Sequence, residues 1–159
     1  MKLEGNVALV TGASRGIGRA IAVRLGRDGA AVVVNYSGNH EAARETVASI
    51  EAASGRAVAV QGDVGKVGDI QRLFDAAFEH FGKLDILVNN AGIMFNKPVA
   101  DVTEEEYDRI FAVNVKGTLN ETLRWTRSTL APFALVRLYS LVPHLPPVVL
   151  IIPVATICA

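Results

Sequence analysis

The chain has 159 residues, enough for one domain that buries about two thirds of the surface exposed when it is unfolded. Its 16 basic and 16 acidic residues cancel, so no net field attracts nucleic acid or an anionic membrane, and neither partner is expected. The single cysteine, Cys158, cannot form an internal disulfide, and the N-terminus has no pattern of a signal or transit peptide. We therefore expect a cytoplasmic location. The histidines match no metal-ligand spacing, so no metal is predicted.

The composition changes abruptly after Arg127. Every glycine and all but one charged residue lie before this point, whereas most prolines follow it. This break predicts one folded domain over residues 1–127 and an atypical, apolar, proline-rich tail over 128–159. The tail is too short and too interrupted by proline for a membrane helix. It resembles translation past a frameshift or a retained intron more than a designed segment.

Short apolar runs alternate with amphipathic segments along the chain. The runs at 7–12, 30–36, 56–63 and 84–92 predict buried parallel strands. Helices are predicted between these runs. The first has Ile17, Ile21 and Leu25 on its inner face and stops at Gly29. The others are 41–54, closed by Gly55, then 69–81, with Phe78 facing inward, and 103–125. The last begins with a capping box, Thr103 and Glu106.

This alternation predicts an α/β fold, a Rossmann-like doubly wound parallel sheet that is truncated after the fourth or fifth strand. The expected strand order is 3-2-1-4. The segment Phe133–Val142 is expected either to add a fifth strand beside the fourth or to stay unanchored. The reason is that an exposed apolar edge strand invites aggregation.

The first strand runs directly into the glycine-rich loop "TGASRGIG". Gly12 permits the sharp exit, Gly16 lets the backbone approach a pyrophosphate, and Gly18 lets the following helix pack closely. A tight turn is the plain alternative, but the order of strand, loop and helix favours a dinucleotide site. The predicted contacts are Gly12, Ser14, Arg15, Gly16, Ile17 and Gly18. Residues 1–127 are therefore predicted to form a dinucleotide-binding domain.

Charge at the end of the second strand predicts the choice of cofactor. Asn35, Tyr36 and Ser37 include no carboxylate that would repel a 2′-phosphate. Arg15 offers a guanidinium fork for such a phosphate, and Ser37 and Asn39 can donate hydrogen bonds. NADP(H) is therefore the predicted cofactor, with Asn35, Ser37 and Asn39 among its contacts. Alternatively, Arg15 is a loop arginine that faces solvent and binds no phosphate.

The loop, together with "NNAG" at 89–92 and "NVKG" at 114–117, resembles the short-chain dehydrogenase/reductase family in its single-domain form over residues 3–125. The segment "VVVNYSGNHEAA" resembles NADPH-dependent carbonyl and ketoacyl reductases, including plant-type aldehyde reductases. The resemblance implies oxidoreduction of a small aldehyde or ketone, or of the corresponding alcohol. It implies that Asp63 and Val64 bind the adenine, and that Asn90, Ala91 and Gly92 line the cofactor.

The same resemblance assigns structural hydrogen bonds to Asn89 and a proton-relay water, on a local helix distortion, to Asn114. Two alternatives stay open: Asp63 can be a helix N-cap, and Asn114 can be a buried amide that serves packing only.

The family's catalytic pattern fails downstream of Asn114. The family uses a serine, a proton-donating tyrosine and a lysine four residues after it, but no Tyr-x-x-x-Lys occurs in this sequence. Ser140 lies near the spacing of the serine. Three interpretations follow: an inactive reductase fragment, a non-catalytic NADP(H)-binding or regulatory isoform that associates with full-length relatives, or a non-functional product.

Overall fold

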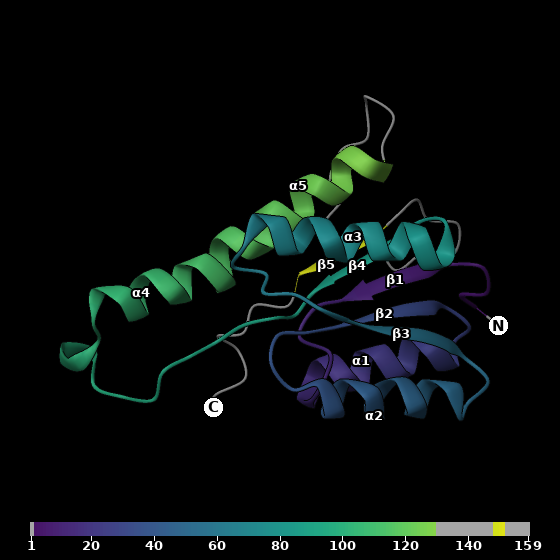
Figure 1. Cartoon of the computed structure of the whole chain (residues 1–159), viewed down its shortest axis with the longest axis horizontal. Helices are drawn as coiled ribbons and strands as arrows, with labels where there is room; N and C mark the ends of the chain where they lie inside the picture. The colour runs from purple at the N-terminus through teal and green to yellow at the C-terminus, as the bar shows by residue number, and fades with distance from the viewer. Residues whose placement is uncertain (1, 130–147, 152–159) are drawn as a thin grey trace.

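A parallel sheet lies between two layers of helices in the computed structural model, which describes residues 2–129 and 148–151 (Figure 1). Its strands are β1 Val7–Val10, β2 Ala31–Tyr36, β3 Arg56–Gln61, β4 Ile86–Asn89 and β5 Val148–Ile151. Their order is β3-β2-β1-β4-β5, and every neighbouring pair is parallel. The predicted Rossmann-like fold and the order 3-2-1-4 are confirmed.

Helices cover both faces of this sheet, with α1 and α2 on one side and α3 and α5 on the other (Figure 1). Their bounds are α1 Gly16–Arg27, α2 His40–Glu51, α3 Val67–Phe81, the 3-10 turn η1 Val99–Asp101, α4 Glu104–Phe111, the π-helical turn η2 Ala112–Gly117 and α5 Thr118–Thr129. Within the described part of the chain, no helix has the length and apolar character needed to cross a membrane.

The central strands divide the core into two layers. Val7, Leu9 and Val33 are buried toward α3, whereas Val10 and Val32 are buried toward α1 and α2. Side chains of a strand alternate between its faces, so a strand covered on both sides needs a continuous apolar run. The runs "VALV" and "AVVV" meet this need. The carboxyl ends of the parallel strands consequently meet at one edge of the sheet.

The fifth strand lies where it was expected, beside β4, but another segment forms it. Val148–Ile151 pairs with Ile86–Asn89 along the whole length of β4. The segment Phe133–Val142, which we expected either to take this place or to stay unanchored, lies outside the described residues. The new strand falls between Pro147 and Pro153 in the sequence, so no proline interrupts its ladder.

The long helix predicted over 103–125 is interrupted. Its capping box is confirmed, since Thr103 Oγ1 accepts a hydrogen bond from the Glu106 backbone N–H and Glu106 Oε2 accepts one from the Thr103 N–H. From Ala112 to Gly117, however, the chain forms a π-helical turn before α5 begins. π-helical turns recur at functional sites in proteins, and this one carries Asn114.

Three smaller predictions differ from the structure. Ile17 is 40% exposed because it lies in the first turn of α1 and lines the open cleft. Phe78 is 41% exposed because it borders a groove between α3 and α5. Helix α2 ends at Glu51, and the left-handed residue after it is Ser54, with φ 62°, not Gly55.

Candidate functional site

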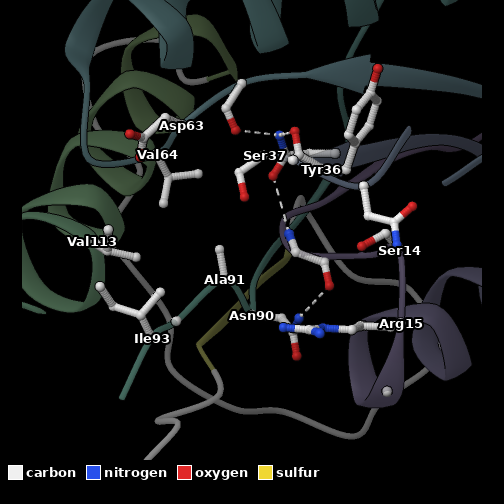
Figure 2. A pocket seen from close by; sticks show the side chains of 18 of the residues that line it. Ser14, Arg15, Tyr36, Ser37, Asp63, Val64, Asn90, Ala91, Ile93 and Val113 are labelled. Carbon is white, nitrogen blue, oxygen red and sulfur yellow. Dashed lines mark hydrogen bonds between the residues drawn. The ribbon is translucent and has the colours of Figure 1, made fainter. Parts of the chain in front are cut away.

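A cleft of about 530 Å³ opens at the carboxyl ends of β1 to β4. All fourteen residues predicted to bind the cofactor line it: Gly12, Ser14, Arg15, Gly16, Ile17, Gly18, Asn35, Ser37, Asn39, Asp63, Val64, Asn90, Ala91 and Gly92. Figure 2 shows Asp63, Val64 and Val113 on the side opposite Ser14 and Arg15. The structure thus brings four separate stretches of the sequence together, while the role of each residue stays a prediction.

The glycine loop presents bare backbone to this cleft. Gly16 has φ +56°, and a Cβ there would meet nothing within 4 Å, so the loop leaves open space at that point. A Cβ on Gly18, in contrast, would lie 2.4 Å from Gly12 O and from Asn90 Nδ2, so only glycine lets α1 approach the sheet this closely. These properties match the separate reasons for which the two glycines were predicted.

The N-terminus of α1 is left without a cap. Arg15 precedes it in an extended conformation with no side-chain capping bond, and its first turn contains no acidic residue. Helix α2 differs, since Asn39 Oδ1 accepts a 3.0 Å bond from Ala42 N and Glu41 lies in its first turn. The unpaired first-turn N–H groups of α1 and its helix dipole therefore favour an anion in the cleft.

The polar side chains around the end of β2 suit a phosphate. Ser37 and Asn39 are exposed, and Arg15 is an exposed guanidinium with no ion-pair partner among the described residues. The last two residues of β2, Asn35 and Tyr36, carry no carboxylate. A cation with free donors and no competing acid is an arrangement that binds a phosphate group.

Asn35 is almost wholly buried, and its amide joins three strand ends. Its Oδ1 accepts a 3.1 Å bond from Gly12 N, and its Nδ2 donates to Gly62 O at 2.9 Å. The side chain thus ties the glycine loop to the ends of β2 and β3. Its effect on a ligand would act through the shape of the loop.

Asp63 and Val64 lie at the far end of the cleft. Val64 is 5% exposed and joins the core, so it offers an apolar wall. Asp63 is not a helix N-cap, because Lys66 precedes α3. Its carboxylate accepts from Gly65 N and pairs with Arg109 Nη1, both at 2.9 Å.

Hydrogen bonds between side chains and the backbone hold the "NNAG" loop against the end of β1. Thr11 Oγ1 accepts bonds from Asn90 N at 3.2 Å and Ala91 N at 3.1 Å, and it donates to Val88 O. Asn90 Nδ2 in turn donates to Thr11 O at 2.8 Å. One buried hydroxyl therefore fixes the position of two residues that line the cleft.

Asn114 reaches the back of the same loop. Its Nδ2 donates to Ile93 O at 2.8 Å and its Oδ1 accepts from Ile93 N at 2.9 Å. The expected helix distortion is present, and these contacts match the alternative in which the amide serves packing; its part in proton relay stays a prediction. Asn89 donates to Thr122 Oγ1 at 3.2 Å, as its structural role required. Ser140 lies outside the described residues.

Helix α5 carries a buried carboxyl group. Glu121 on α5 is 1% exposed, and its Oε1 has no hydrogen-bond partner. Burial raises the pKa of Glu121 to about 8, against a smaller lowering by a hydrogen bond with Thr11. Burial therefore favours the protonated form of Glu121 at neutral pH.

Sequence reasoning missed several residues of the cleft. Tyr36, Gly38 and Gly62 adjoin predicted contacts, and Ile93 follows "NNAG" directly, so extending each motif by one residue would have found them. Arg109 and Val113 come from α4 and η2, and no local motif marks them. Among the described residues, no group of three His, Cys, Asp or Glu side chains could hold a metal ion.

A cleft at the carboxyl ends of a doubly wound parallel sheet, with a glycine loop leading into an uncapped helix, is typical of dinucleotide-binding domains. The chain belongs to the short chain dehydrogenase family, whose model matches residues 6–130.

Relatives and solved structures agree with this assignment. An uncharacterized oxidoreductase of Methylorubrum extorquens is 54% identical over 121 residues, which are 76% of this chain and 49% of that protein. A short chain dehydrogenase from Burkholderia cenocepacia, solved in complex with NADP, superposes with a TM-score of 0.77 at 43% identity, over 80% of this chain and 52% of that one. The landomycin C-6 ketoreductase LanV, solved with bound NADP and rabelomycin, superposes with a TM-score of 0.75 at 45% identity. The match covers 80% of this chain and 54% of that one. The chain thus spans about half the length of these proteins.

Proposed function

We propose that this chain forms the NADP(H)-binding part of a short-chain oxidoreductase that acts on aldehydes or ketones, or on the corresponding alcohols. The observation that carries the proposal is a cleft with an uncapped α1, an exposed Arg15 and no carboxylate at the end of β2. Two of the similar structures were solved with NADP, and one of these proteins is a ketoreductase. Both facts support the proposal.

In this proposal, each part of the cleft binds a different part of NADP(H). The first-turn N–H groups of α1 bind the diphosphate, and Arg15 and Ser37 bind the 2′-phosphate. At the far end, Asp63 accepts a hydrogen bond from the amino group of the adenine, beside the apolar wall of Val64. The cofactor supplies a hydride when it is bound, and the described residues orient it.

A second candidate is a chain that binds NADP(H) without catalysis. The absence of any Tyr-x-x-x-Lys from the sequence favours it. A regulatory role and association with full-length relatives belong to this candidate. A cytoplasmic location is part of the proposal for both candidates. Residues 1–127 act as the binding domain in both candidates, and the tail from residue 128 supplies β5.

The chain should bind NADPH more tightly than NADH, because only NADPH offers Arg15 a 2′-phosphate. Changing Arg15 to Glu should weaken the binding of NADPH by roughly 1.5 to 3 kcal/mol, or about 10- to 150-fold, and leave the binding of NADH nearly unaffected. The measurement is a fluorescence titration with each dinucleotide. Arg27→Glu makes the same charge change at the exposed end of α1, outside the cleft, and should have no such effect. Equal affinities of the wild-type chain for NADPH and NADH would contradict the assignment of Arg15.

A further inference from the structure

One ion pair joins α4 to the far end of the cleft. Asp63 Oδ2 lies 2.9 Å from Arg109 Nη1, and Asp63 Oδ1 accepts a 2.9 Å bond from Gly65 N. The backbone of Asp63 is fixed as well, since its N–H donates to Asp69 Oδ2 at 2.9 Å. The carboxylate is 19% exposed and therefore reachable from the cleft that it lines. Three independent contacts thus hold one acceptor in place.

The chain leaves room for this pair at Gly65. A Cβ on Gly65 would lie 2.8 Å from Arg109 Nη1 and 3.2 Å from Asp63 Oδ1. Any larger residue would therefore push the guanidinium away from the carboxylate. Gly65 has no left-handed backbone conformation, so a side chain at this position would be accommodated mainly by moving the end of the Arg109 side chain away from Asp63.

The pair also restricts what the carboxylate can do. An ionised carboxylate only accepts hydrogen bonds, and each oxygen of Asp63 keeps capacity beyond the bond already made. Arg109 fixes the plane of the group, because the guanidinium is rigid. Without Arg109, the Asp63 side chain would keep its bond from Gly65 N but lose the contact that orients its second oxygen.

We propose that Arg109 is a positioning residue that holds Asp63 so that the cleft selects adenine over bases without a 6-amino group. The inference rests on the proposed function, in which Asp63 accepts that amino group. Hypoxanthine carries an oxygen at the same position, which would face the carboxylate as a second acceptor. A site built around a fixed acceptor rejects such a base, whereas a mobile acceptor can turn away from it.

The test compares reduced NADPH with its hypoxanthine analogue in binding titrations. The wild-type chain should prefer NADPH by about 10-fold or more. Arg109→Gln should reduce this preference at least about fivefold by weakening NADPH, with the affinity for the analogue within about twofold of wild type. Arg109→Lys should restore part of the preference, since it returns the charge but not the fork. Gly65→Ala should act like Arg109→Gln while removing no charge.

The control is Lys83→Gln, which breaks a 2.9 Å pair with Asp85 of similar exposure outside the cleft and should leave the preference unchanged. Thermal unfolding of each variant checks that it folds, and Gly65→Ala decides the question if Arg109→Gln does not. Equal weakening of both dinucleotides, or an unchanged preference, would overturn the inference and leave Arg109 a structural residue. A wild-type chain that binds NADPH without preferring it to the analogue would also overturn it. No NADPH binding at all would refute the proposed function itself.

Discussion

The chain should lose stability as the pH rises from about 5 to 8, because burial raises the pKa of Glu121 to about 8 from an ordinary value of 4.5. Between these two values the folded chain holds a proton that the unfolded chain has released, so each pH unit lowers the free energy of unfolding by about 1.4 kcal/mol. The contribution of this proton to the free energy of unfolding is complete below pH 4.5 and is lost by about pH 8, a total on the order of 5 kcal/mol.

Urea unfolding of the wild-type chain and Glu121→Gln at several pH values tests this expectation. Glutamine has the same shape and cannot ionise, so the variant should be more stable than wild type at pH 8, with the difference shrinking toward pH 5. Glu41→Gln, at an exposed site in the first turn of α2, serves as the matched control and should follow the wild type. The other titrating groups are the same in wild type and Glu121→Gln, so their contributions cancel in the difference between the two stabilities. A difference between wild type and Glu121→Gln that stays constant with pH would show that Glu121 does not carry this proton.

The second large effect concerns catalysis. This polypeptide alone should bind NADPH yet not reduce aldehydes or ketones at an enzymatic rate. Hydride transfer leaves an alkoxide that must gain a proton, and a positioned acid is typically worth a factor of about 10² to 10⁴. The sequence contains no Tyr-x-x-x-Lys, and both amide atoms of Asn114 are already bonded to Ile93.

The assay follows NADPH oxidation with a panel of aldehydes and ketones, with a full-length short-chain reductase as the positive control. The chain must be purified free of host reductases. A rate that survives repurification and falls in Ser140→Ala or Tyr139→Phe would contradict this expectation, because the tail would then supply a catalytic group.

Much of the cleft could be predicted because its residues follow strand ends. The sites "TGASRGIG", Asn35 to Asn39, Asp63 with Val64 and "NNAG" each come directly after an apolar run. In a parallel sheet these ends meet at one edge, so a correct strand order was enough to bring all fourteen predicted residues together.

Residues that reach the cleft from helices could not be predicted in this way. Arg109 and Val113 lie on α4 and η2, where ordinary helical spacing gives no sign of a contact with Asp63 or Val64. Glu121 was unexpected because a charged residue is seldom fully buried without a partner, and sequence alone does not show which side of a distorted helix faces the sheet. The strand at Val148–Ile151 was missed because a short apolar run among prolines fits several structures.

The most direct test of the central claim, that the cleft binds NADP(H), is a titration of the chain with NADP⁺ followed by amide chemical shifts in NMR spectra. The largest changes should fall in the loop from Gly12 to Gly18, at Ser37 to Asn39, at Asp63 with Val64, and at Ala91 with Gly92. The groove between α3 and α5, lined by Phe74, Leu123 and Arg127 among others, should stay unchanged. Changes concentrated in that groove, or none at saturating NADP⁺, would contradict the account.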